Sequence, residues 1–213
     1  MIEESPELHS TDGLRLEAEL WTPDDPRAGL VFCHPHPKMG GTMSAPLLIA
    51  VTDELVKKNW TVLRFNFRGI GESEGEASTG RAEVADAEGA VKFMRGRFGD
   101  LPIAIAGWSF GAVVATRVAA GDEGLAALVA IAPALKEKPG ITDGLPPAAE
   151  VDIKIPALVL CAVNDELVDV EDCRRWAETV QTEFHEMPGA NHFFWAKYDK
   201  LAGVIVEFLE AEV

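Results

Sequence analysis

A serine between two glycines, directly after a short apolar run, is the feature of this sequence best suited to chemistry. The run I-A-I-A at 103–106 leads into G-W-S-F-G at 107–111, and a helix-like segment follows. Glycines on both sides of Ser109 relieve the crowding of a sharp strand-to-helix turn, and the helix dipole stabilises negative charge that develops there. The pattern predicts Ser109 as a nucleophile. The alternative is a structural glycine-rich turn with an incidental serine.

Ser109 needs a general base, because a hydroxyl is a poor nucleophile at neutral pH. Histidine is mostly neutral near pH 7, which suits it to this role. His9 is expected in a solvated N-terminal tail and His185 inside a strand, whereas His192 follows the turn-rich sequence P-G-A-N at 188–191. A loop at the end of a strand can bring its side chain over the sheet edge. We therefore predict His192 as the base.

An acid must then orient the imidazole and stabilise its charged form. Asp165 is the first acidic residue after the apolar run at 157–162. Glu166 and Asp169 are rivals, although Asp169 also suits the first turn of the helix expected next. We predict Asp165 as the acid.

Short apolar runs and helix-like segments alternate along the chain. Buried strands are expected at 29–33, 61–65, 103–106, 125–131 and 157–162, a further short strand at 183–187, and a half-exposed strand at 14–21. Helices are expected at 45–59, 82–97, 110–120, 170–180 and 198–211. The alternation predicts an α/β fold, with a mostly parallel central sheet flanked by helices on both faces. We expect a single domain over 1–213 without a separate lid domain, and ligands at the carboxyl ends of the strands.

These features together resemble the α/β-hydrolase superfamily, and most closely the small, lidless serine esterases and dienelactone-hydrolase-like proteins of bacteria. Besides the serine turn, the resemblance rests on H-P-H-P at 34–37 with Gly40 and Gly41, on R-F-N-F-R-G-I-G-E-S at 64–73, and on G-A-N-H at 189–192. It covers nearly the whole chain from about residue 14. The order Ser109, Asp165, His192 is the one expected of this superfamily, and the family pattern also carries an acid at position 165.

Acyl transfer also needs two N–H donors for the oxyanion. One is expected to be the backbone N–H of Phe110, directly after the nucleophile. The other should come from the loop after the strand at 29–33, where Pro35 and Pro37 replace flexible residues and cannot donate. By elimination we predict His36 as the second donor. Met39, Trp108, Phe193 and Trp195 flank these positions and could line the substrate pocket, although core packing is an equal alternative.

Two motifs have competing interpretations. The H-x-H pair at 34–36 could hold a metal, but metal sites of that kind need further ligands and belong to larger barrels. The turn at 68–73 is expected to be structural, with substrate contact through Arg68 as the alternative. Residues 133–156, rich in proline and glycine, could form a lid, a wall of the cleft or a connector.

The amino-acid composition limits which partners the protein is expected to bind. With 35 acidic against 19 basic residues and a net charge of −16, neither nucleic acid nor an anionic membrane surface is an expected partner. Three widely spaced cysteines, no secretory signal and no stretch long enough to span a bilayer predict a cytoplasmic protein. Monomer and homodimer both stay open.

The sequence thus predicts a serine hydrolase that cleaves esters or thioesters of small-molecule substrates, with no metal or organic cofactor. The same residues could serve a peptidase or amidase, a lactonase or an acyltransferase, and fold alone does not choose among them. A non-catalytic binding protein of the same fold is the alternative from another class.

Overall fold

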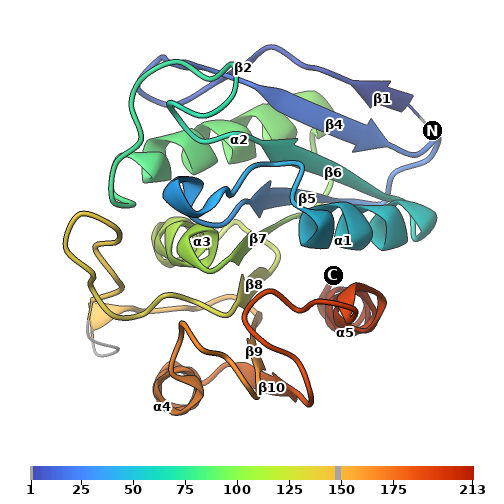
Figure 1. The fold of residues 1–213 in the computed structure, drawn as a ribbon. Coiled ribbons are helices and arrows are strands. Elements are labelled where there is room, and N and C mark those ends of the chain that lie inside the picture. Colours follow the sequence, from blue (N-terminus) through green and yellow to red (C-terminus); the bar gives the residue numbers. More distant parts are fainter. Residues whose placement is uncertain (1, 147–149) are drawn as a thin grey trace.

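Eight strands form one sheet in the order β1-β4-β6-β5-β7-β8-β9-β10 in the computed structural model, which describes residues 2–146 and 150–213 (Figure 1). The strands are β1 (Ile2–Glu4), β4 (Ala18–Thr22), β5 (Ala28–Cys33), β6 (Trp60–Phe65), β7 (Ile103–Trp108), β8 (Leu128–Ile131), β9 (Ala157–Ala162) and β10 (Glu183–Met187). From β6 to β10 every neighbouring pair is parallel, while β1 and β4 are antiparallel to their neighbours. The mostly parallel sheet expected from the sequence is confirmed.

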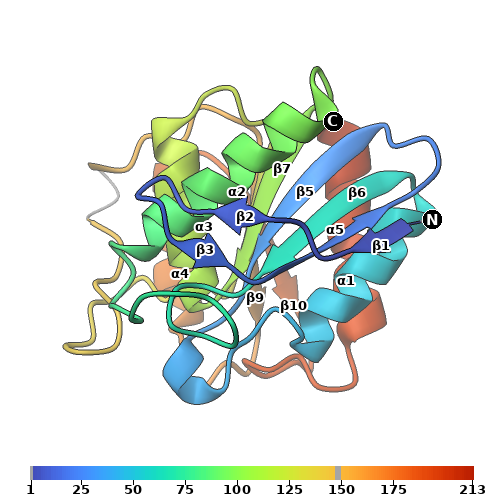
Figure 2. The same cartoon turned by 90° about the horizontal axis from the view of Figure 1, so that it is seen from above.

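The apolar runs form strands because both faces of the sheet are covered by helices. Every residue of β5, β6, β7, β8 and β9 is buried. The helices are α1 (Pro46–Lys57), α2 (Glu83–Phe98), α3 (Phe110–Gly121), α4 (Val170–Thr179) and α5 (Tyr198–Glu212), within a few residues of the segments expected. Figure 2 shows α1 and α5 on one face and α2, α3 and α4 on the other.

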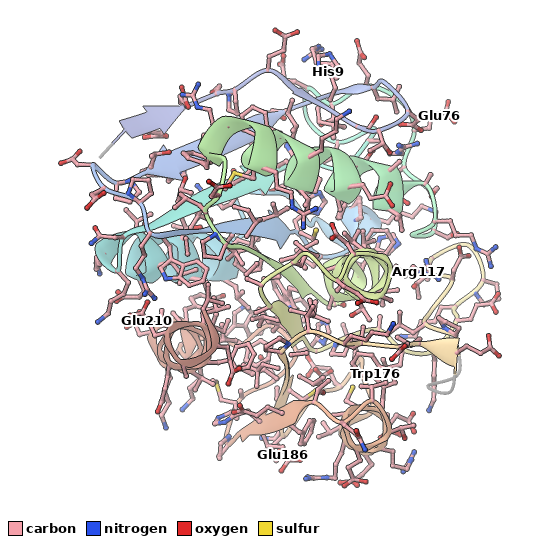
Figure 3. All side chains as sticks on the ribbon, turned by 180° about the vertical axis from the view of Figure 1, so that it is seen from behind. His9, Glu76, Arg117, Trp176, Glu186 and Glu210 are labelled. Atoms are coloured by element: carbon pink, nitrogen blue, oxygen red, sulfur yellow. The ribbon has the colours of Figure 1, made fainter. Side chains whose placement is uncertain are left out.

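The helices of the two faces pack into separate apolar clusters. Leu48 of α1 and Ile205 of α5 belong to one cluster, whereas Val91 of α2 and Val114 of α3 belong to another. In Figure 3, Glu210 of α5 and Trp176 of α4 lie on opposite flanks of the sheet. Among the described residues, no helix has both the length and the apolar character needed to cross a bilayer.

The N-terminal region departs from expectation. The strand expected at 14–21 is divided into β3 (Arg15–Leu16), which pairs with β2 (Leu8–His9), and β4 in the main sheet. The division falls at Glu17, whose backbone N–H donates to the Ser73 hydroxyl rather than to a strand. His9 is exposed, as expected, but the segment around it is not a tail, because β1 and β2 pair with other strands.

The connector at 133–156 is fastened to its surroundings over its first half. Ile141 accepts a hydrogen bond from His36 through its carbonyl, Gly144 accepts one from Arg117 of α3, and the Asp143 carboxylate accepts from Arg81 and Thr79. Residues 147–149 of this segment lie outside the described residues. The described part behaves as an anchored connector, since none of its residues lines the cleft described below.

Two glycines of α2 stand in contrasting surroundings. A Cβ on Gly89 would lie 2.2 Å from the His9 carbonyl oxygen and 2.7 Å from the Ser10 Cα, whereas a Cβ on Gly96 would meet nothing within 4 Å. Gly89 therefore lets the β2–β3 hairpin approach the helix closely, and Gly96 has no such role.

Alanine at these two positions should have opposite effects on stability. Gly89→Ala forces backbone apart and should cost about 1 to 3 kcal/mol of unfolding free energy. Gly96→Ala should add about 0.4 to 1 kcal/mol, because alanine has the higher helix propensity and a less flexible unfolded chain. Urea denaturation of the three proteins measures both changes, and equal shifts for the two variants would contradict the packing argument.

Candidate active site

Ser109 occupies a strained turn between β7 and α3. Its backbone is left-handed, with φ 56° and ψ −110°, and its N–H donates to the Ile131 carbonyl at 2.7 Å. The flanking glycines are required by close packing: a Cβ on Gly107 would lie 2.1 Å from the Gly111 carbonyl oxygen, and one on Gly111 would lie 2.4 Å from the Cys33 carbonyl oxygen. Strain of this kind persists where the surroundings impose it, and it is common at functional sites.

The three residues predicted for catalysis lie in hydrogen-bond contact. The His192 Nε2 is 3.1 Å from the Ser109 Oγ, and the His192 Nδ1 is 2.8 Å from the Asp165 Oδ2. The tautomer with its proton on Nδ1 donates to the carboxylate and leaves Nε2 free to accept the serine proton. Both the histidine and aspartate side chains are buried, at 4% and 1% exposure. The arrangement can therefore deprotonate the serine hydroxyl as it attacks.

Asp165 is oriented by the loop that carries it. Its Oδ1 accepts the backbone N–H groups of Leu167 and Val168 at 2.9 and 2.8 Å. A buried carboxylate needs such donors, because desolvation otherwise disfavours its charge. The loops after β9 and β10 are also joined directly, since the Asn164 N–H donates to the Ala190 carbonyl at 3.0 Å. This link holds the loop of Asp165 beside the loop of His192.

The rival acids take other roles. Asp169 caps α4 by accepting hydrogen bonds from the N–H groups of Glu171 and Asp172. The Glu166 carboxylate accepts the backbone N–H of His192 at 3.3 Å, so it contacts the base from the side of the main chain. Sequence reasoning weighed Glu166 only as a rival to Asp165, and no sequence signal indicated this contact.

The residues predicted for the oxyanion hole pack against each other. The rings of His36 and Phe110 lie edge to face, with centroids 4.9 Å apart. Among the described residues, neither backbone N–H donates to another main-chain group. The loop that carries His36 is closed by the Gly41 N–H, which donates to the His36 carbonyl, and a Cβ on Gly41 would lie 2.0 Å from the Pro35 carbonyl oxygen. Their role as oxyanion donors remains a prediction.

The two histidines of the H-x-H pair are held by protein groups. The His34 Nδ1 donates to the Pro35 carbonyl at 2.7 Å and its Nε2 accepts the Phe67 N–H at 3.1 Å. The His36 Nδ1 accepts the Lys38 N–H, and its Nε2 donates to the Ile141 carbonyl. All four ring nitrogens are engaged, so the pair does not fit a metal centre.

A cleft of about 280 Å³ opens above Ser109 and His192. The residues predicted as pocket lining all contribute to it: Met39, Trp108, Phe193 and Trp195. Their contact with substrate remains a prediction. Tyr198, the only tyrosine of the chain, also lines the cleft from the start of α5. Sequence reasoning missed Tyr198, because nothing in the local pattern distinguishes it from an ordinary helix residue.

Arg68 serves the structure rather than the cleft. Its guanidinium donates to both carboxylate oxygens of the buried Asp86 and to Asp12, and it does not line the cleft. Because Arg68 is the first residue of the 68–73 turn and Asp86 lies in α2, these contacts join the turn to α2. The contacts of Arg68 support a structural role for the 68–73 turn.

Fold and site define an α/β hydrolase of the lidless kind, and comparisons with known proteins agree. The chain is 28% identical to an alpha-beta serine hydrolase homologue from Coxiella burnetii, with a TM-score of 0.85 over 97% of each chain. It is 29% identical to an a/b serine hydrolase without lid from Xanthomonas campestris, with a TM-score of 0.84 over 98% of this chain and 94% of that one. It is also 27% identical to an uncharacterized protein of Rickettsia prowazekii, over 92% of this chain and 84% of that protein.

The family model described as serine aminopeptidase, S33, matches residues 24–151, which is more than half of the chain. The protein belongs to this family of hydrolases within the α/β-hydrolase superfamily. The resemblance stated from the sequence motifs is thereby confirmed.

Burial of His34 makes the free energy of unfolding depend on pH. Its ring is fully buried, and this lowers its pKa from 6.5 to about 4, against the opposing effect of its hydrogen bond to the Pro35 carbonyl. The folded protein therefore keeps the ring neutral while the unfolded chain takes up a proton below about pH 6.5. Stability contributed by the neutral ring is complete above pH 6.5 and is lost as the pH falls toward 4.

We expect this loss to be about 3 kcal/mol. His34→Gln keeps a donor and an acceptor but cannot titrate, so between pH 7 and pH 4 it should lose about 3 kcal/mol less than the wild type. Urea denaturation across this range measures the difference, and carboxylates that titrate in both proteins cancel. Parallel pH profiles would show that His34 takes up its proton in the folded state as readily as in the unfolded chain.

Proposed function

We propose that the protein is a serine hydrolase that cleaves carboxylic ester or thioester bonds of small to medium, uncharged substrates through an acyl-enzyme intermediate. The observation that carries the proposal is the continuous line of hydrogen bonds from the Ser109 Oγ through the His192 ring to the Asp165 carboxylate. The line ends at the wall of an open cleft, where a carbonyl group can reach the serine.

The reaction begins when the Ser109 Oγ attacks the carbonyl carbon and its proton passes to the His192 Nε2. The oxygen of the tetrahedral intermediate takes up negative charge between the N–H groups of Phe110 and His36. The bond to the alcohol or thiol then breaks, and the leaving group receives the proton from His192. Water attacks the acyl-enzyme with the same histidine as base, which releases the acid and restores the serine hydroxyl.

The cleft favours an ester over the peptide suggested by the family description. An aminopeptidase must hold a free α-ammonium group, and carboxylates are the usual partners of such a charge in a site sheltered from water. The described residues that line this cleft include no Asp, Glu, Lys or Arg. A neutral acyl compound is the substrate that such a lining accepts at the lowest desolvation cost.

Replacing the nucleophile tests the proposal directly. In the presence of EDTA, the wild type should hydrolyse p-nitrophenyl esters and Ser109→Ala should be slower by roughly 10³-fold or more. A fluorophosphonate should add one covalent group to the wild type and none to the variant, as measured by intact mass. Equal rates and equal labelling in both proteins would exclude Ser109 as nucleophile.

A second pair of variants tests the acid. Asp165→Asn keeps an oxygen for the N–H groups of Leu167 and Val168 but presents an amide to His192, which favours the wrong tautomer. We expect kcat to fall by about 10³- to 10⁴-fold. Asp169→Asn is the matched control, because asparagine caps a helix as well as aspartate does, and kcat should stay within about twofold. A large loss of kcat in Asp169→Asn alone would show that Asp169, and not Asp165, acts as the acid.

A further inference from the structure

Aromatic side chains continue outward from the base along one side of the cleft. The Phe193 ring lies edge-on to His192, with centroids 5.6 Å apart and an angle of 89°. Trp195 then stacks on Phe193 at 5.0 Å and 15°. Trp195 is nevertheless 64% exposed, more than any other large apolar residue among the described ones. One face of Trp195 is thus occupied by Phe193, while much of the ring remains open to solvent.

The backbone is strained to hold these rings in place. Phe194 and Ala196 have left-handed conformations, with φ 52° and 57°, although neither is glycine. Phe194 is fully buried in the apolar cluster that also contains residues of α1 and α5. Two successive turns close around it, from the Phe194 N–H to the Asn191 carbonyl and from the Lys197 N–H to the Phe194 carbonyl. With Phe194 anchored inside, the residues on either side of it both line the cleft.

The position of this aromatic pair relative to the base decides which part of a substrate it meets. His192 gives its proton to the leaving oxygen, so the alcohol part of an ester lies beside His192 when the bond breaks. Phe193 is in ring contact with His192 and Trp195 extends the row beyond it. The groups past His192 therefore face the alcohol part rather than the oxyanion.

We propose that the alcohol part of the substrate is an uncharged aromatic group that stacks on the exposed face of Trp195. Flat rings stack on an indole face, and the cleft lining offers no charged side chain to a charged group. Met39, 59% exposed, also lines the cleft and adds a flexible apolar contact. This inference rests on the proposed function and makes Trp195 a specificity-determining residue.

The test compares benzyl acetate with cyclohexylmethyl acetate, which share an acyl group and have alcohols of similar size but differ in flatness. The wild type should prefer the benzyl ester by about three- to tenfold in kcat/KM. Trp195→Leu should bring the ratio close to unity, and Trp195→Phe should keep most of the preference. Ile49→Ala, which removes an exposed apolar side chain outside the cleft, should leave the ratio unchanged.

The outcomes separate this inference from the proposed function. If both esters are hydrolysed and the ratio is the same in the wild type and Trp195→Leu, the aromatic preference is overturned while the esterase chemistry stands. If the wild type hydrolyses neither these two esters nor the p-nitrophenyl esters, the proposed function is overturned. Whenever the two acetates are not turned over, their binding is measured instead. In Ser109→Ala, benzyl acetate should shift the Trp195 indole N–H resonance and cyclohexylmethyl acetate should not. Equal shifts, or none, would overturn the inference as well.

Discussion

Ser109 is held in its left-handed conformation by close approaches on both sides, and these approaches also build its surroundings. The absence of a Cβ at Gly107 lets β7 run close under the first turn of α3, and its absence at Gly111 lets that turn meet the carbonyl end of β5. The same contact brings the Phe110 ring against His36 in the loop after β5. Ser109 is therefore fixed relative to the N-terminus of α3 and to the loop after β5. Electrostatic stabilisation of an oxyanion requires a fixed arrangement of this kind.

The described residues that line the cleft are uncharged, although the protein as a whole is strongly acidic. The chain carries a net charge of −16, yet the cleft lining includes no charged side chain among the described residues. The buried Asp165 carboxylate accepts hydrogen bonds from two backbone N–H groups and from the His192 ring. Another buried carboxylate, Asp86, is paired with Arg68 away from the cleft. Both of these buried carboxylates thus have their own partners, because an unpaired charge in the interior would be costly.

Two loops near the cleft differ in whether they line it. The connector after β8 is tied down through Ile141, Asp143 and Gly144, so its described residues stay clear of the cleft. The loop between His192 and α5 instead lines the cleft directly, with the half-buried Phe193 and the exposed Trp195. The side chains of this loop therefore lie at the rim of the cleft, whereas the described residues of the connector do not line it.

The sequence by itself determined the elements whose cause is local. Apolar runs become parallel strands because both of their faces are buried, and the glycines around Ser109 mark a turn that few other sequences can make. Asp165 and His192 could be predicted because each follows the end of a strand, where ligands gather in such sheets. Tertiary structure decided what depends on partners distant in sequence. It split the expected strand at Glu17, engaged the rings of the H-x-H pair with backbone groups, and brought Tyr198 into the cleft, because each of these outcomes depends on hydrogen bonds or packing across the fold that no local pattern encodes.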